Sequence, residues 1–323
     1  MELRRRRRRR GRGAEEHRGW GADVITIAIP TYNRGAILVE TIARLLALEP
    51  RADAILIADQ TRDHQSDVAQ ALEQWSRDGT IHWLRLPEPS IPHAMNEALL
   101  AAKTKLVLFL DDDLIPARDL AGAHVAAHRE HDVWAVAGQV LQPGEDQESF
   151  DEGGDDLEFH FNSDRGRMIT NVMAGNLSVD RARALQIGGF DENFVGAAYR
   201  FETDFAMRIA VAGGAIWFEP RASIHHLKLS TGGLRTFGDH RAVASPEHTT
   251  GDYYFALHHV PHFWRYAARR LAKNVLTRYH AAHPWTIPGK IAGELRGLAL
   301  ARKMHRKGRR LRTVPPDDGL RAS

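Results

Sequence analysis

The stretch KLVLFLDDDLIP, residues 105–116, joins five apolar residues directly to three acids. The apolar run is typical of a strand that is covered on both faces within a parallel sheet. Asp111, Asp112 and Asp113 follow where that strand ends, and open α/β sheets bind ligands at this end of their strands. Three adjacent acids repel one another, and hard divalent cations take carboxylate and phosphate oxygens together. The stretch therefore predicts an α/β sheet with a site for a cation and a diphosphate.

Strand and helix patterns alternate on both sides of this stretch, which indicates a mainly parallel sheet flanked by helices. Residues 141–167 are rich in Asp, Glu and Gly, interrupt the alternation and are typical of a long loop. Beyond residue 253 the chain becomes aromatic and basic, and we predict helices near 253–280 and 288–307. The predicted strands cover residues 24–29, 54–58, 81–86, 106–110, 133–140 and 215–218.

The composition argues against several classes of protein. Without cysteine the chain forms neither disulfides nor thiolate metal sites. No apolar run reaches the ~18 residues of a membrane-spanning helix, so none is expected. The basic N-terminus lacks the apolar core of a secretory signal. These features favour a cytoplasmic protein, either free or at the inner face of the cell membrane.

Positive charge is concentrated at the two ends of the chain. Residues 1–18 hold nine arginines and three acids, and residues 302–323 hold eight Lys or Arg and two acids. Because the whole chain has a formal net charge of +3, residues 19–301 carry −9. Basic ends favour polyanions, either lipid head groups or nucleic acid. We expect residues 1–21 to be a disordered tail, since like charges repel and nothing there can be buried.

Six segments resemble, in order and spacing, the family-2 glycosyltransferases with the GT-A fold. The resemblance covers roughly residues 23–235, and no single motif would carry it alone. It implies a GT-A catalytic domain over 22–240, followed by a helical, basic extension over 241–323. The six segments are IPTYNR (29–34), ADQTRD (58–63), DDD (111–113), GNLSVDR with GGFDE (175–181 and 188–192), FETDFAMR (201–208) and HHLKLSTGGLR (225–235).

The resemblance implies an inverting, metal-dependent transfer of a sugar from a nucleotide-diphospho-sugar to a glycan or lipid-linked acceptor. Two of the donor assignments have structural alternatives: Asp59 could cap the next helix, and His93 with Asn96 could simply begin one. Gly232, Gly233 and Arg235 suggest a flexible loop with a cation for phosphate. The residues expected to bind the donor are Pro30, Tyr32, Arg34, Asp59, His93, Asn96, Asp111 and Asp112.

A Mn²⁺ or Mg²⁺ ion is the expected cofactor. Asp113 would hold it, together with Asp111 directly or through water or ribose, while strand alternation turns Asp112 away. A solvated acidic turn is the alternative. The resemblance adds His226 as a third ligand, although His225 is an equal candidate by chemistry.

Glu202 is the predicted general base, because it opens an amphipathic helix and could take the proton of an incoming hydroxyl. The family usually has an acidic pair here, whereas this chain has Phe201 and Glu202, so Asp204 remains an alternative. Acids are also favoured in a first helical turn by the helix dipole. The resemblance implies an acceptor side formed by Gly175, Asn176 and Asp191.

The aromatic and basic C-terminal part suits either a membrane surface or a helix packed on the catalytic domain. Two other functions remain open. A sugar-nucleotide nucleotidyltransferase is disfavoured because the first turn, PTYNRG, is not a Gly-rich phosphate loop. A polyanion-binding protein is disfavoured by the acidic middle of the chain, and no nucleic-acid partner is expected.

Overall fold

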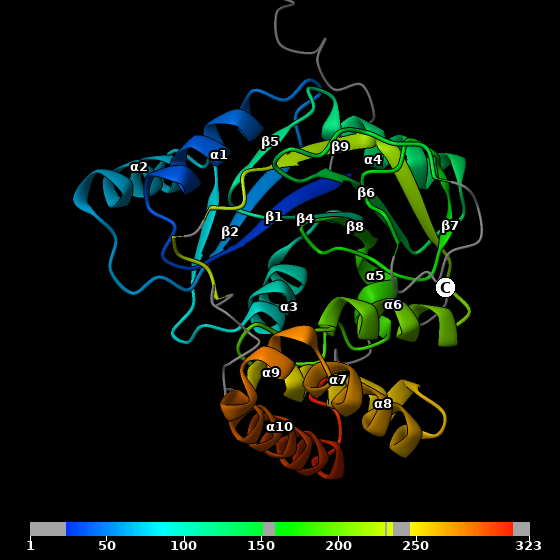
Figure 1. Cartoon of the computed structure of the whole chain (residues 1–323). Helices are drawn as coiled ribbons and strands as arrows, with labels where there is room; N and C mark the ends of the chain where they lie inside the picture. Colours follow the sequence, from blue (N-terminus) through cyan, green and yellow to red (C-terminus); the bar gives the residue numbers. More distant parts are fainter. Residues whose placement is uncertain (1–23, 151–158, 230, 235–245, 313–323) are drawn as a thin grey trace, which may run out of the picture.

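The computed structural model describes residues 24–150, 159–229, 231–234 and 246–312, without the side chains of Glu247 and His248. The Arg-rich tail over 1–21 and Arg235, both singled out in the sequence, lie outside the described residues. Within them, the chain forms a central sheet covered by helices on both faces, with a group of helices at the C-terminal end (Figure 1).

Nine strands of the described chain form one sheet in the order β3-β2-β1-β4-β8-β6-β9-β5, with β7 paired to β9. The predicted parallel part is confirmed, since β1 pairs in parallel with both β2 and β4, and β2 with β3. β8 lies antiparallel between β4 and β6 and makes the sheet mixed. The strands are β1 (Ile25–Thr31), β2 (Ala54–Asp59), β3 (His82–Arg85), β4 (Leu106–Leu110), β5 (Leu114–Pro116), β6 (Ala135–Leu141), β7 (Arg167–Ile169), β8 (Asn176–Asp180) and β9 (Ile216–His226).

Strand β4 shows why the sheet is covered on both faces. Leu106, Leu108 and Leu110 pack in one core with α1, α2 and α4, while Val107 and Phe109 pack in the other with α3, α5 and α6. All five side chains of β4 are buried, as its continuous apolar run predicts. The helices are α1 (Ala36–Leu46), α2 (Ser66–Arg77), α3 (Ile91–Ala101), α4 (Leu120–Glu130), α5 (Arg181–Gln186), α6 (Phe201–Val211), α7 (Glu247–His259), α8 (Phe263–Val275), α9 (Arg278–Ala282), the 3-10 helix η2 (Pro284–Thr286) and α10 (Ile287–Lys307).

The C-terminal extension is helical, as predicted, and the stretch near 253–280 is divided into separate helices. α7 ends at His259, before Pro261, and α8 begins after His262, whose φ is 60°. Pro261 has no N–H to donate and the left-handed residue turns the chain, so the helix divides here. No helix in the described part of the chain is both long and apolar enough to cross a membrane.

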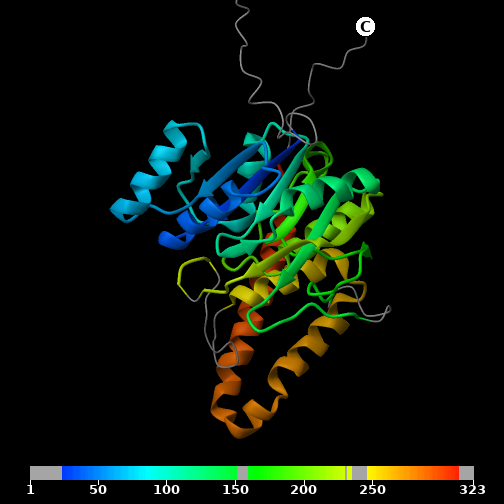
Figure 2. The same ribbon diagram turned by 90° about the horizontal axis from the view of Figure 1, so that it is seen from above.

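Helix α7 packs on the helices that cover one face of the sheet. Its residues Tyr253, Tyr254 and Phe255 are 2%, 0% and 3% exposed and belong to the core on the α3 and α6 face of the sheet. These three aromatic residues therefore cannot contact a membrane. For them, the structure replaces the membrane-surface alternative of the sequence analysis with a helix packed on the core. The remaining aromatic and basic residues lie on α8 and α10, which project from the body (Figure 2).

Two histidines of α4 are buried against β8 and should make the fold sensitive to acid. His124 Nδ1 and His128 Nε2 lie 2.8 and 2.9 Å from Ser178 Oγ. Burial lowers the pKa of His124 from 6.5 to about 4 and that of His128 to about 3. In the unfolded chain these histidines bind protons below their ordinary pKa of 6.5, whereas in the folded chain they stay neutral until the pH approaches the lowered values. The folded state is therefore favoured fully above pH 6.5, and it loses stability as the pH falls toward the folded-state pKa values.

We expect each of these histidines to lower the free energy of unfolding by roughly 2 kcal/mol between pH 7 and pH 5. Urea denaturation at several pH values measures this loss. The variant His128→Gln removes one titrating group, so its stability should depend less steeply on pH. An equally steep dependence in the variant would contradict this assignment.

Candidate active site

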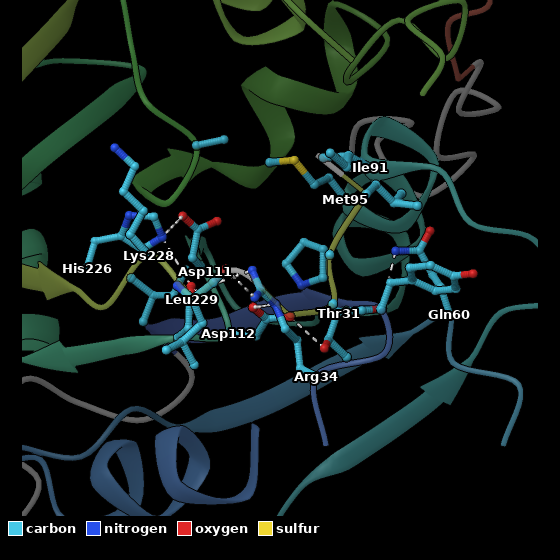
Figure 3. Close-up of a pocket in the computed structure, with 18 of the residues that line it drawn as sticks. Thr31, Arg34, Gln60, Ile91, Met95, Asp111, Asp112, His226, Lys228 and Leu229 are labelled. Carbon is cyan, nitrogen blue, oxygen red and sulfur yellow. Dashed lines mark hydrogen bonds and ion pairs between the residues drawn. The ribbon is translucent and has the colours of Figure 1, made fainter. Parts of the chain in front are cut away.

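A pocket opens at the carboxyl ends of β1, β2 and β4, and is closed on other sides by the end of β9, the start of α3 and the start of α6 (Figure 3). The segments that form it lie up to about two hundred residues apart in the chain. The structure thus brings together these predicted site residues: Pro30, Tyr32, Arg34, Asp111, Asp112, Asp113, Glu202 and His226.

Successive carboxylates of the acidic triplet point to different partners. Asp112 Oδ2 accepts a hydrogen bond from Thr31 Oγ1 at 2.7 Å, and Oδ1 lies 2.8 Å from Arg34 Nε in an ion pair that is poorly angled for a hydrogen bond. Asp113 Oδ1 and Asp111 Oδ2 instead lie 3.1 and 3.6 Å from His226 Nε2. Asp112 is therefore turned away from the other two acids, as the sequence predicts, although residues 111–113 form a bend between β4 and β5 and not a strand.

Burial and hydrogen bonding shift the acids in opposite directions. Burial raises the pKa of Asp112 to about 7, although Arg34 and Thr31 partly offset it. Burial would also raise the pKa of Asp113, but hydrogen bonds from His226 and from the backbone N–H of Leu229 lower it overall. Asp113 is therefore held in its charged form more firmly than Asp112.

Asp111, Asp113 and His226 fit a divalent cation by their chemistry. They supply two carboxylates and an imidazole on one side of the pocket, and the Asp111 side chain is 43% exposed. Across the described residues no three His, Asp or Glu side chains are already spaced as ligands around one point. The three groups contact one another instead, so a small side-chain movement would have to accompany metal binding. His225, the alternative ligand, is exposed and does not line the pocket.

Gly175 makes room for the carboxylate of Asp111. A Cβ atom at Gly175 would lie 2.3 Å from Asp111 Oδ2, far inside van der Waals contact. Gly175 itself does not line the pocket, whereas its neighbour Ala174 does. The sequence analysis places Gly175 on the acceptor side, but in the structure it packs closely beneath Asp111 and does not line the pocket.

If Asp111 is the metal ligand that the sequence predicts, the variant Gly175→Ala should weaken Mn²⁺ binding by about 10–100-fold, because the added methyl group displaces this carboxylate. Calorimetric titration with Mn²⁺ tests this, with thermal unfolding as the check on folding. Unchanged affinity for Mn²⁺ would show that Asp111 does not need its present position.

Arg34 links the acidic triplet to the loop after β9. Its Nη1 donates to the carbonyl oxygen of Thr231 at 2.7 Å, and its Nη2 lies 3.6 Å from Asp113 Oδ2. Gly232 has φ +76°, and a Cβ there would be 2.2 Å from the carbonyl oxygen of Asn33. The loop therefore lies directly on the turn after β1, and glycine is required for this close approach.

Glu202, at the start of α6, lines the pocket and accepts a hydrogen bond from the backbone N–H of Ala174 at 2.9 Å. Asp204 does not reach the pocket. It is fully buried and contacts His259 Nε2 at 2.7 Å, Arg309 Nη1 at 2.6 Å and Arg208 Nε at 2.9 Å. The structure thus removes Asp204 as the alternative base.

The pKa of Asp204 agrees with this structural role. Burial alone would raise it, but the hydrogen bond from His259 and the charges of Arg208 and Arg309 hold the pKa well below its ordinary value. Such a carboxylate is a weak base.

Asp59 does not face the pocket, contrary to expectation. Its carboxylate is fully buried and accepts hydrogen bonds from Thr61 N at 2.8 Å and Trp83 Nε1 at 2.8 Å, with His64 Nε2 at 2.6 Å. The next residue, Gln60, lines the pocket instead. Because side chains alternate along an extended segment, a shift of one residue decides which of the two can meet a ligand.

His93 and Asn96 lie on the wrong face of α3 for the predicted donor contact. Ile91 and Met95 line the pocket. His93 Nδ1 lies 2.7 Å from Arg312 Nη2. Asn96 is buried and holds the backbone of Phe190. The sequence identified this helix correctly, but not the face that it turns to the pocket.

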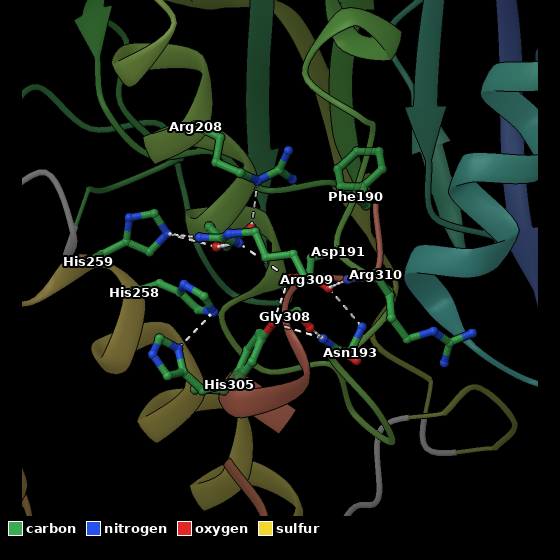
Figure 4. A network of polar contacts seen from close by, with 12 residues as sticks. Phe190, Asp191, Asn193, Arg208, His258, His259, His305, Gly308, Arg309 and Arg310 are labelled. Atoms are coloured by element: carbon green, nitrogen blue, oxygen red, sulfur yellow. Dashed lines mark hydrogen bonds and ion pairs between the residues drawn. The ribbon is translucent and has the colours of Figure 1, made fainter. Parts of the chain in front are cut away.

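Asn176 and Asp191 are also buried, so neither can contact an acceptor. Asn176 Nδ2 donates to the carbonyl oxygens of Gln139 and Ala222 beneath the sheet edge. Asp191 accepts hydrogen bonds from Tyr254 OH at 2.8 Å and the backbone N–H of Arg310 at 3.0 Å (Figure 4). The GGFDE segment therefore anchors the C-terminal extension.

Sequence reasoning missed several residues that line the pocket. Lys228 is a cation two positions after His226, and it lines the pocket. Its position in the HHLKLSTGG segment could have indicated it, whereas nothing in the sequence pattern distinguishes Gln60, Ile91, Met95 or Gln142.

Comparison with known proteins agrees with this architecture. The family model described as Glycosyl transferase family 2 matches residues 26–188. The uncharacterized glycosyltransferase YfnE of Bacillus subtilis (strain 168) is 26% identical over 115 residues, which cover 35% of this chain and 29% of YfnE. The present chain thus corresponds to less than a third of that relative.

Solved structures share the fold at low identity. A crystal structure of GalNAc-T7 with UDP, GalNAc and Mn²⁺ superposes with a TM-score of 0.60 at 13% identity, over 78% of this chain and 51% of that one. The mannosyltransferase PcManGT from Pyrobaculum calidifontis, in complex with GDP-Man and Mn²⁺, gives 0.51 at 16% identity, over 89% and 80%. These similarities establish the GT-A fold. Since the family model spans half of its 323 residues, the chain belongs to glycosyltransferase family 2.

Proposed function

We propose that this protein transfers a sugar, with inversion, from a nucleotide-diphospho-sugar to a hydroxyl of a glycan or lipid-linked acceptor. The observation that carries the proposal is one pocket, at the carboxyl ends of the strands, with Asp111, Asp113 and His226 on one side and Glu202 on another. Two separate groups of charged side chains suit the two halves of a transfer reaction, the departing diphosphate and the attacking hydroxyl.

On the donor side, Arg34 and Lys228 supply positive charge toward a diphosphate, while Tyr32 and Gln60 lie where the nucleoside would extend. Asp111, Asp113 and His226 would hold Mn²⁺ or Mg²⁺. A bound ion there would act as a Lewis acid toward the negative charge that grows on the diphosphate. The neighbours that bind UDP or GDP-Man with Mn²⁺ support a nucleotide donor and this metal, without deciding the base.

On the acceptor side, Glu202 would take the proton of the attacking hydroxyl. The oxygen forms a bond to the anomeric carbon as the bond from that carbon to the diphosphate oxygen breaks, and the electron pair leaves with the diphosphate. Attack from the face opposite the leaving group inverts the anomeric configuration. The hydrogen bond from Ala174 N fixes one carboxylate oxygen of Glu202.

The family assignment leaves the nucleotidyltransferase and the polyanion-binding alternatives without specific support. We place the enzyme in the cytoplasm, where nucleotide sugars are made, with a peripheral contact to the membrane if its acceptor is lipid-linked. The acceptor hydroxyl would have to reach the part of the pocket that Glu202 lines.

A thermal-shift panel tests the donor half of the proposal. The full chain would be heated with UDP-, GDP- and TDP-sugars, each with and without Mn²⁺. A ligand that binds only the folded state raises its melting temperature, so one nucleotide class should stabilise the protein only with metal present. If no nucleotide-sugar stabilised the protein, with or without Mn²⁺, the proposal would be contradicted.

A further inference from the structure

A helical hairpin, residues 263–307, projects from the body of the molecule (Figure 2). It consists of α8, α9, η2 and α10. Its tip lies between the end of α8 at Val275 and the start of α10 at Ile287. The hairpin shares no residue with the pocket described above, so its surface needs a separate explanation.

Charge on the hairpin is almost entirely positive. Residues 263–307 contain eleven Lys and Arg and a single acid, Glu294. Glu294 is 1% exposed and pairs internally with Arg270. Every exposed, formally charged side chain of the hairpin is therefore basic, in contrast to the acidic middle of the chain as a whole.

Large apolar side chains are exposed on the same hairpin. Among the described residues, eleven large hydrophobic side chains are exposed, and five of them lie within these 45 residues. Leu276 and Trp285, at the tip, are 81% and 72% exposed. Large apolar side chains are unfavourable on a helix surface that faces only water, so their concentration here indicates an interaction surface. The five are Trp264, Leu276, Trp285, Leu295 and Leu300.

The basic and apolar side chains form adjacent rows. On α8, Arg265, Arg269 and Lys273 are exposed and spaced four residues apart, so they share one face. Trp264 begins a neighbouring exposed row at the same spacing. The guanidinium of Arg302, from α10, lies 5.2 Å from the Trp264 ring, which places the outer surfaces of the two helices side by side.

We propose that this hairpin docks on the surface of an anionic lipid bilayer. Leu276 and Trp285 would enter the boundary between head groups and acyl chains, and the basic rows would contact lipid phosphates. An amphipathic, basic surface with Trp and Leu is the chemistry that binds such an interface. Nucleic acid would use the basic rows but leave Leu276 in water, and two copies of the hairpin would repel each other. The inference does not depend on the sugar transfer proposed above.

Vesicle binding of the full chain tests the apolar part of this proposal. Vesicles of phosphatidylcholine with about one third phosphatidylglycerol, carrying brominated acyl chains, should bind the protein and quench its tryptophan fluorescence, whereas pure phosphatidylcholine should not. The double variant Trp264→Phe/Trp285→Phe should bind but lose most of the quenching. Quenching that is equal in this variant, or absent in the wild type, would overturn the proposal.

Charge reversal tests the basic rows. Because all variants keep the Arg-rich N-terminus, two triple variants with the same change in net charge can be compared directly. The hairpin variant should bind the anionic vesicles at least about tenfold more weakly than the control, whose altered residues are exposed on the catalytic domain. Equal binding would overturn the proposal. The variants are Arg265→Glu/Arg269→Glu/Lys273→Glu and, as control, Arg51→Glu/Arg62→Glu/Lys103→Glu.

Two further measurements test the alternative partners of the hairpin, which are nucleic acid and a second copy of this chain. Hairpin-dependent binding to duplex DNA without vesicle binding, or a dimer that the variant Leu276→Ser/Trp285→Ser dissociates, would each overturn the membrane assignment. Donor-dependent thermal shifts, measured without vesicles, stay normal in the hairpin variants if only docking is affected. Failure of the docking proposal is thereby separated from failure of the proposed enzymatic activity.

Discussion

The variant Asp113→Asn should abolish metal-dependent donor binding and lower kcat/KM by at least about 10³-fold. Asp113 is fully buried, yet its pKa is lowered, so its charge is held in place where His226 and the open carboxylate of Asp111 converge. Asparagine keeps the shape of the side chain and removes the charge. The expected loss follows because the charge that grows on the leaving diphosphate would no longer be neutralised.

Calorimetric titration with Mn²⁺ and the activated sugar measures this effect, with circular dichroism as the check on folding. Asp119→Asn is the matched control, because Asp119 is exposed, lies six residues after Asp113 and makes no capping hydrogen bond from its side chain. The control should bind donor as the wild type does. Wild-type turnover by Asp113→Asn would remove Asp113 from the metal site.

The variant Glu202→Gln should retain donor binding and lower kcat by about 10²–10⁴-fold, the usual contribution of a general base. Glutamine can still accept the hydrogen bond from Ala174 N, so the pocket should keep its shape. What it cannot do is take the proton of the acceptor hydroxyl. Donor affinity from thermal shifts and turnover from a transfer assay separate the two effects.

Asp204→Asn provides the contrasting result two residues further along the same helix. Asp204 is buried against His259, Arg208 and Arg309. Removing its charge leaves the arginines without their partner, which should destabilise the fold by roughly 3–5 kcal/mol, whereas Glu202→Gln should leave stability almost unchanged. If the Asp204 variant were stable and inactive while the Glu202 variant turned over normally, the two roles would have to be exchanged.

Local patterns in the sequence were sufficient for much of the architecture. The apolar run 106–110 predicts a doubly covered strand, and β4 is buried along its whole length. The sequence also predicts that Asp112 turns away from the other two acids. In the structure Asp112 contacts Thr31, while Asp111 and Asp113 face His226. These features depend on neighbours within a few residues, or on the common edge that parallel strands share. The resemblance to the family, and not a local pattern, singled out Arg34, Tyr32 and Glu202, which all line the pocket.

Assignments that depended on distant packing were wrong. His93 and Asp191 each stand in a suitable motif, but both contact the segment 309–312, which reaches back from the end of α10. Asn96 is instead enclosed by hydrogen bonds with the backbone of Phe190 and the side chain of Glu192. Arg309 contacts both Asp191 and Asp204, which lie more than one hundred residues away in the chain. Asp59 was misassigned for a related reason, because His64 and Trp83 enclose its carboxylate.

The sequence by itself indicated six of the strands, the acidic edge of the sheet and a resemblance to the family. It did not indicate β5, β7 or the antiparallel strand β8, which makes the sheet mixed. Only the tertiary structure decided which acids remain open to a ligand and which are enclosed by arginine and histidine. The physical reason is that a carboxylate acts on a substrate only if its charge is left accessible, and that depends on contacts between segments whose meeting no local pattern encodes.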